Sequence, residues 1–264
     1  MDSVALRVLH LTDIHLFADP AQRWGQANPA AALEQVLDAI VADAWRPDFC
    51  VVTGDLSDDG SDSAYEQLRD ALAVLEVPAF VVPGNHDAAE PMRRAFAAGP
   101  VRWVRSAEVG AWRIVALDSQ LEGEARGLLG PDELTALATT LRDGDGRPTL
   151  VILHHPIAPI CPMPCCQLED GHAFFAACSA YPNVKAALAG HVHCADDRVL
   201  HGVRSLVTPS TCLQAEHPAQ APDGPEPPFL EVHAISAARR GYRKLELFAD
   251  GRIETEVVWV GEQG

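Results

Sequence analysis

Short runs of hydrophobic residues alternate with helical patterns through the first two thirds of the chain. The runs of strand length are Val4–Leu11, Phe49–Thr53, Ala79–Val82, Trp112–Leu117, Leu150–Leu153 and Val184–Ala189. Short, nearly continuous apolar runs are typical of strands that are buried on both faces. Their alternation with helical segments predicts an α/β fold in which the central strands are largely parallel.

The segments between these runs carry signals for helix termini. Pro29–Trp45 follows Asn28, a residue type favoured at N-caps, and places proline at the first helical position. A capping box begins at Ser63 and predicts a helix that continues to about Leu75. Pro131–Leu141 also has proline in its first turn. We expect these helices to cover the outer faces of the sheets.

The last third of the chain has strand-like runs without helices between them. These runs are Val199–Leu200, Ser205–Val207, Phe229–Ile235, Tyr242–Phe248 and Ile253–Val260. They predict a second, more antiparallel sheet, and Asp250-Gly251 predicts a β-hairpin over 242–260. The proline-rich segment His217–Pro228 is expected to be an exposed loop. We therefore predict one domain over 1–264, with two packed mixed β-sheets flanked by helices.

The net charge and the cysteine content limit what the protein is expected to bind and where in the cell it is expected to lie. The chain has 20 Lys and Arg against 37 Asp and Glu, a net charge of −17, which disfavours binding to nucleic acid or to an anionic membrane. No apolar run is long enough to cross a bilayer. The acidic start Met1-Asp2-Ser3 does not resemble a signal peptide, and the seven cysteines are an odd number. We expect reduced thiols and a cytoplasmic location.

Side chains that can bind metals follow five of the predicted strands. In chain order they are Asp13 and His15, Asp55, Asn85 and His86, His154 and His155, and His191 and His193. Ligand sites in α/β sheets form beyond the carboxyl ends of the strands, so these groups can converge there. Residues two apart in an extended segment point to the same side, which predicts that Asp13 and His15 project together.

These motifs resemble the signature of the calcineurin-like metallophosphoesterase superfamily. The blocks D-x-H, G-D, G-N-H-D, H-x-P and G-H-x-H occur here in the family's order. Gly130–Leu134 and Pro209–Cys212 further resemble the bacterial class III cyclic-nucleotide phosphodiesterases, and the match extends from Leu9 to Val260. The resemblance implies a four-layer α-β-β-α sandwich with a dinuclear metal centre, and the subgroup suggests a homodimer.

The resemblance also implies a role for each motif residue. Asp13, His15 and His193 bind one metal, Asn85, His154 and His191 bind the other, and Asp55 bridges them. His154 is preferred over His155 because the family's ligand stands two residues before the proline. His86 is expected to face the substrate phosphate as a catalytic residue.

The expected chemistry is hydrolysis of a small phosphodiester by a hydroxide that bridges two divalent metals. A shared carboxylate holds such metals roughly 3.5–4 Å apart, and their charge lets an acidic protein bind phosphate. Ligands of the His, Asp and Asn types favour Fe or Mn, with Zn and Co as alternatives. A 3′,5′-cyclic nucleotide is the first substrate candidate. A glycerophosphodiester, a broad range of small diesters and, third, a phosphomonoester are the alternatives. A metal-free interaction scaffold is disfavoured because every ligand position is filled.

One segment departs from the subgroup. Cys161-Pro162-Met163-Pro164-Cys165-Cys166 occupies the place where the subgroup often has a Trp/Met-Asp segment over the substrate. Its Cys-x3-Cys-Cys pattern favours plain reduced thiols, with a structural zinc site and a redox role as alternatives. The remaining histidines are expected to have surface or structural roles: His10, His172, His201, His217 and His233.

Overall fold

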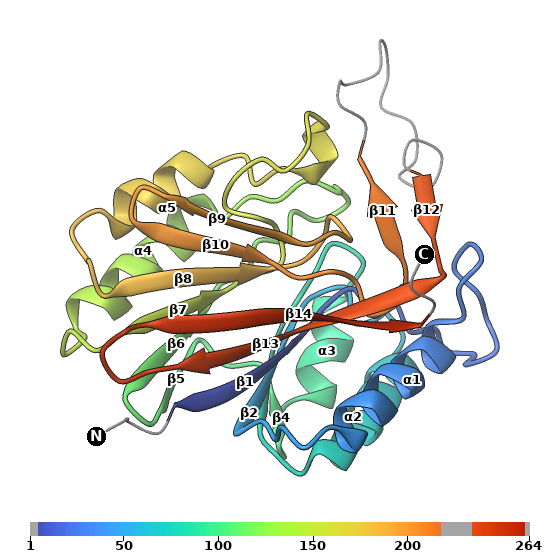
Figure 1. The fold of residues 1–264 in the computed structure, drawn as a ribbon. Coiled ribbons are helices and arrows are strands. Elements are labelled where there is room, and N and C mark those ends of the chain that lie inside the picture. Colours follow the sequence, from blue (N-terminus) through green and yellow to red (C-terminus); the bar gives the residue numbers. More distant parts are fainter. Residues whose placement is uncertain (1–4, 218–233, 262–264) are drawn as a thin grey trace.

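The computed structural model describes residues 5–217 and 234–261, and in this part of the chain two six-stranded sheets pack face to face (Figure 1). The first sheet has the order β14 (Ile253–Gly261), β13 (Arg239–Leu247), β1 (Leu6–Leu11), β2 (Phe49–Thr53), β3 (Ala79–Val82) and β4 (Val101–Arg102). The second has the order β5 (Ser106–Val109), β6 (Trp112–Ala116), β7 (Thr149–Ile152), β8 (Val184–Ala189), β10 (Val203–Val207) and β9 (Asp196–Leu200). A separate pair joins β11 (Gln214–Glu216) to β12 (Ala234–Ser236).

Helices cover the outer face of each sheet (Figure 1). The helices are α1 (Pro29–Ala42), α2 (Asp62–Leu72) and α3 (Ala89–Ala95) on the first sheet, and α4 (Gly130–Arg142) and α5 (Gly171–Cys178) on the second. Short 3₁₀ turns span Ala73–Leu75 and Pro164–Cys166. The predicted α/β fold of two mixed sheets flanked by helices is confirmed. Among the described residues, no helix combines the length and hydrophobicity needed to cross a bilayer.

Strand β2 shows why the central strands are hydrophobic throughout. Val51 packs between the two sheets, against residues such as Trp112 and Ile114. Its neighbours Cys50 and Val52 face the other way, into the layer beneath the helices. Successive side chains of a strand point to opposite faces, so a strand with an apolar layer on each side has no position for polar residues.

The prediction that the last third forms its own sheet was wrong. β13 pairs antiparallel with β1, and β10 pairs parallel with β8, so these strands extend both existing sheets. Without further strands, β1 and β8 would be edge strands with unpaired backbone N–H and C=O groups. β13 and β10 pair with those groups. β13 and β14 form a hairpin with paired residues from Arg239 with Gly261 to Leu247 with Ile253. Most of Phe229–Ile235, and the His217–Pro228 loop after His217, lie outside the described residues.

The helix starts were predicted with mixed success. Asn28 caps α1 as expected, and its Oδ1 accepts a hydrogen bond from the N–H of Ala31. Helix α2 is capped by Ser61, which accepts from the N–H of Ala64, so the prediction of a capping box at Ser63 was wrong. Ser63 fits the capping-box sequence better, with Glu66 three residues later, but the preceding loop is already turned at Ser61, whose N–H donates to Asp59.

Candidate metal centre

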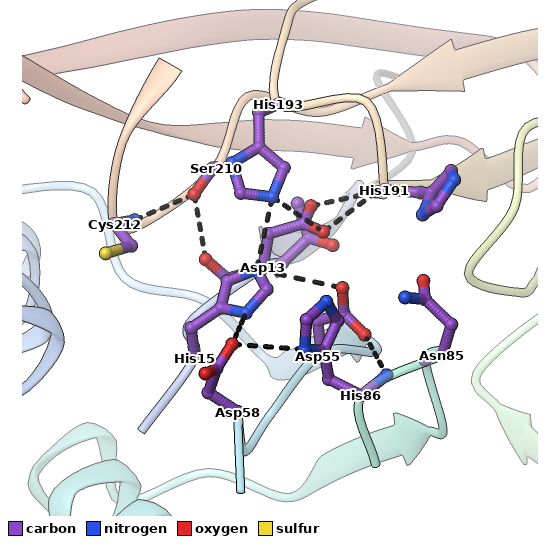
Figure 2. A network of polar contacts seen from close by, with 12 residues as sticks. Asp13, His15, Asp55, Asp58, Asn85, His86, His191, His193, Ser210 and Cys212 are labelled. Carbon is purple, nitrogen blue, oxygen red and sulfur yellow. Dashed lines mark hydrogen bonds and ion pairs between the residues drawn. The ribbon is translucent and has the colours of Figure 1, made fainter. Parts of the chain in front are cut away.

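The motif residues converge between the carboxyl ends of strands from both sheets (Figure 2). Asp13 and His15 follow β1, Asp55 follows β2, and Asn85 follows β3. The second sheet contributes His154 after β7 and, as a pair, His191 and His193 after β8. All except Asn85 are buried, and Asn85 is partly exposed. The two packed sheets therefore bring together side chains that lie up to 180 residues apart in the sequence (193 − 13).

A first group of ligand atoms comprises Asp13, His15 and His193, whose ligand atoms lie within 4.8 Å of one another. Nδ1 of His15 donates to Asp58, and Nδ1 of His193 donates to the carbonyl of Leu213, at 3.0 Å in each case. Because these partners are acceptors, the Nε2 atom of each ring presents a lone pair. The two Nε2 atoms are 3.1 Å apart, and that of His193 is 3.4 Å from Oδ1 of Asp13.

A second group forms around His154. Its Nδ1 lies 2.8 Å from the carbonyl of Thr53, which orients Nε2 towards Nδ1 of His191 and Oδ1 of Asn85, both at 3.1 Å. Nε2 of His191 lies 2.7 Å from the carbonyl of Cys165, so Nδ1 is the nitrogen left to act as a ligand. This group therefore offers two imidazole nitrogens and one amide oxygen at a common point.

Asp55 lies between the two groups. One carboxylate oxygen, Oδ2, is 3.7 Å from Nε2 of His15 and 3.3 Å from Nε2 of His154. The other oxygen, Oδ1, accepts a hydrogen bond from the N–H of His86 at 3.0 Å. Burial alone would raise the pKa of Asp55, but the neighbouring His154 and His86 hold it well below its usual range. An ionised carboxylate is thus shared by both groups.

These residues fit two divalent metal ions. Imidazole lone pairs that face each other at 3.1 Å repel unless a cation lies against both, and each group contains such a pair. Burial tends to lower the pKa of His154, but the charge of Asp55 raises it to about 9, so in the metal-free chain a proton competes for the metal's position. Nitrogen and oxygen ligands of this kind suit Mn, Fe, Co or Zn.

The ligand segments have an unusual backbone. Left-handed φ values of +49° to +71° occur at Asp13, His15, Asp55, His191 and His193. The prediction of extended segments was therefore wrong. Such conformations cost about 1–3 kcal/mol each and persist only where surrounding contacts hold them. Ser210 provides one such contact, because its Oγ donates to the carbonyl of Asp13 and accepts from the N–H of Cys212 (Figure 2).

Glycine is needed at two positions because other parts of the chain approach closely. A Cβ atom on Gly84 would overlap Oδ1 of Asp55, and one on Gly190 would overlap Oγ1 of Thr12 and Oδ2 of Asp13. Neither glycine has a positive φ. They leave room for carboxylates of the site.

His86 lies at the edge of the site and is held by Asp58, a residue that the sequence analysis missed. Oδ1 of Asp58 is 3.0 Å from Nδ1 of His15 and 3.1 Å from Nδ1 of His86. Burial would lower the pKa of His86, but Asp55 and Asp58 together raise it to about 9. The side chain of His86 is 34% exposed, so its ring can meet a substrate. Trp24, also missed, stacks on His15 at 3.9 Å.

Other polar residues near the centre have structural partners. Both ring nitrogens of His10 contact threonine hydroxyls, and burial lowers its pKa to about 3. His155 contacts Ser119 through Nδ1 and the carbonyl of Ala125 through Nε2, so both of its nitrogens are engaged. Asp87 accepts hydrogen bonds from three backbone N–H groups in the loops that carry Asp55 and Asn85, and from the hydroxyl of Tyr65 on α2.

Comparison with known proteins places this chain in a family. The profile of the calcineurin-like phosphoesterases matches residues 6–195. The chain is 34% identical over 252 residues to the 3′,5′-cyclic adenosine monophosphate phosphodiesterase of Pseudomonas aeruginosa, covering 95% of this chain and 88% of the relative. It is also 34% identical over 260 residues to the Escherichia coli protein of the same name, covering 96% and 89%.

A solved structure supports the fold. A dimetal phosphatase from Danio rerio superposes with a TM-score of 0.64 at 15% identity, covering 99% of this chain and all of that one. At 15% sequence identity, this similarity shows the fold alone. The family profile covers most of the chain, and the described residues bring its buried His and Asp groups together. The chain therefore belongs to the calcineurin-like phosphoesterase family and is a metal-dependent phosphoesterase.

Proposed function

We propose that the protein is a dinuclear phosphodiesterase that hydrolyses a small diester, with 3′,5′-cyclic nucleotides as its substrates. The observation that carries this proposal is the Asp55 carboxylate, which lies within 3.7 Å of a ligand nitrogen from each of the two groups. The relatives named as cyclic AMP phosphodiesterases align over nearly the whole chain and support the choice of substrate.

The ligand assignment follows the two groups. Asp13, His15 and His193 hold one metal, Asn85, His154 and His191 hold the other, and Asp55 bridges them. His155 is left out because Ser119 and the carbonyl of Ala125 occupy its nitrogens. When bound, the two metals lower the pKa of a water molecule and neutralise the charge of the phosphoryl oxygens.

The chain's own residues position the substrate and move a proton. Asp58 holds Nδ1 of His86, which leaves Nε2 of that ring to carry the second proton. Once the ring is cationic, Nε2 can bind a phosphoryl oxygen or protonate the leaving oxygen. Asp58 also holds Nδ1 of His15, so one carboxylate fixes both a metal ligand and the proposed acid.

A substrate panel tests the proposal. Purified protein loaded with Mn, Fe or Zn is assayed on 3′,5′-cyclic AMP, a glycerophosphodiester, and p-nitrophenyl mono- and diesters. We expect the largest kcat/KM on the cyclic nucleotide, and no turnover by the Asp55→Asn variant. Faster turnover of the glycerophosphodiester would instead identify a broader phosphodiesterase. Faster turnover of the monoester with every metal would contradict the proposal.

A further inference from the structure

A second group of metal-binding side chains lies outside the proposed catalytic centre. One ligand atom each from Cys161, Cys166 and His217 lies within 4.8 Å of the other two. Cys166 is fully buried and Cys161 is 6% exposed. Met163, Val192 and Val207 form one buried hydrophobic cluster with these two cysteines. Two thiols and an imidazole meeting in an apolar enclosure are an arrangement that plain core packing does not require.

The His217 ring is oriented as a metal ligand would be. Its Nε2 lies 2.6 Å from the carbonyl oxygen of Val192, which can only accept, so Nε2 carries the ring proton. The remaining nitrogen, Nδ1, is buried, and the ring contacts the thiols of Cys161 and Cys194. A histidine that binds a metal typically donates its other N–H to a carbonyl in this way. Nδ1 therefore presents its lone pair to sulfur atoms.

We propose that Cys161, Cys166, Cys194 and His217 bind a structural zinc ion. Three thiolates and one imidazole form one of the standard tetrahedral zinc sites, and four residues between Cys161 and Cys166 is an accepted ligand spacing. Cys194 lies outside the group of three whose ligand atoms are within 4.8 Å of one another, but its thiol interacts with the same His217 ring as Cys161, and we assign it as the fourth ligand on that contact.

The 3₁₀ turn over Pro164–Cys166 explains why this spacing was not recognised in the sequence. It buries Cys166 completely and leaves Cys165 partly exposed, with its Sγ 3.7 Å from that of Cys166. The ligand pair is therefore Cys161 and Cys166. The Cys-x3-Cys-Cys pattern does not distinguish Cys165 from Cys166, and the sequence predicts a surface or structural role for His217.

The zinc would act on the catalytic centre through the backbone. The carbonyl of Cys165, inside the zinc loop, accepts the hydrogen bond from Nε2 of His191 at 2.7 Å. Cys194 directly follows His193. A metal that fixes both segments fixes the orientation of two histidines of the catalytic centre. The zinc ion is thus a positioning element that lies beside the reaction centre and does not touch the substrate.

Metal counting is the first test. Zinc per chain is measured in protein carrying Asp13→Asn and Asp55→Asn, which remove the carboxylate of one proposed metal position and the carboxylate shared by both. We expect one zinc to remain, and to be lost when Cys161→Ser and Cys166→Ser are added. The control Cys178→Ala, a buried cysteine of α5, should keep it, and so should Cys165→Ser. Equal zinc content with and without Cys161→Ser and Cys166→Ser would overturn the proposal.

X-ray absorption at the zinc edge is the second test, and it needs no variant. None of the proposed catalytic ligands contains sulfur, so a zinc–sulfur shell at about 2.3 Å in the wild-type protein can come only from the cysteine site. Zinc bound with nitrogen and oxygen neighbours alone would overturn the proposal. So would loss of two free thiols through a Cys161–Cys166 disulfide in protein purified without oxidant, because a disulfide cannot supply thiolates.

Discussion

The Asp58 carboxylate couples the two chemical tasks of the site. It accepts hydrogen bonds from His15, a proposed ligand, and from His86, the proposed acid. Its side chain is 15% exposed, and these two contacts hold its pKa below the usual range although burial opposes them. Asp58 therefore remains ionised at neutral pH. An ionised Asp58 keeps Nδ1 of both rings protonated, so the orientation of His86 depends on the same residue that orients a metal ligand.

The role of His86 is tested by changing the leaving group. His86→Ala should keep both metals and lose roughly 10²–10⁴ in rate on a cyclic nucleotide, because the ribose alkoxide leaves poorly without a proton. On a p-nitrophenyl diester the loss should be clearly smaller, since nitrophenolate needs no proton. Rates and metal content are measured together. An equal loss on both substrates would show that His86 stabilises phosphoryl charge and does not act as an acid.

Asp87 holds the loops that carry the proposed ligands. Its Oδ2 accepts from the N–H groups of Leu56 and Gly84, and its Oδ1 from the N–H of Ser57 and the hydroxyl of Tyr65. Asp87→Asn turns an amide N–H₂ towards one pair of donors, so we expect the free energy of unfolding to fall by about 1–3 kcal/mol. Urea unfolding in the presence of a metal chelator measures this free energy. The surface substitution Asp145→Asn is the control. An unchanged midpoint would contradict this role.

The convergence of the motif residues could be predicted from the sequence, but their backbone conformation could not. Asp13, His15 and the other motif residues could be named because their order along the chain is specific. Their left-handed backbone depends on distant contacts, such as that between Ser210 and the carbonyl of Asp13. Asp58 was missed because a lone aspartate carries no signal until two histidines are placed beside it.

Secondary-structure elements were predicted best where they are long and apolar. Strands β2 and β3 have the predicted boundaries, since each lies in a core that is apolar on both sides. The short elements α3, α5, β4 and β5 were missed because two to eight residues carry too little periodicity to recognise. The first helix was predicted to end at Trp45 but ends at Ala42, where Asp43 takes an extended conformation.

The start of α2 gives a direct test with an internal control. Ser61→Ala should lower the free energy of unfolding by about 1 kcal/mol, because the N–H of Ala64 loses its partner. Ser63→Ala should change it by much less, since Ser63 lies inside the helix. Denaturant midpoints of both variants are compared in chelator, which removes the metal contribution. A larger effect at Ser63 would restore the capping box predicted from the sequence.

At the scale of the whole molecule, the site exists only because two sheets meet. Strands β1, β2 and β3 end beside β7 and β8. Each of the two proposed metal groups therefore combines side chains from both sheets and depends on the packing between them. The sequence could indicate two sheets, but the strand order rests on contacts such as that of β13 with β1, which no local pattern encodes. The homodimer stays a prediction, and sedimentation at the 28.3 kDa monomer mass would contradict it.

The most direct test of the account is a metal titration of catalytic activity. Chelator-treated protein receives increasing amounts of Mn²⁺, and the initial rate of AMP formation from 3′,5′-cyclic AMP is plotted against bound manganese per chain, with zinc counted separately. We predict no activity without manganese, a rise that levels off at two bound equivalents, and no activity in Asp55→Asn at any loading. Full activity at one equivalent, or turnover in the metal-free protein, would contradict a dinuclear phosphodiesterase.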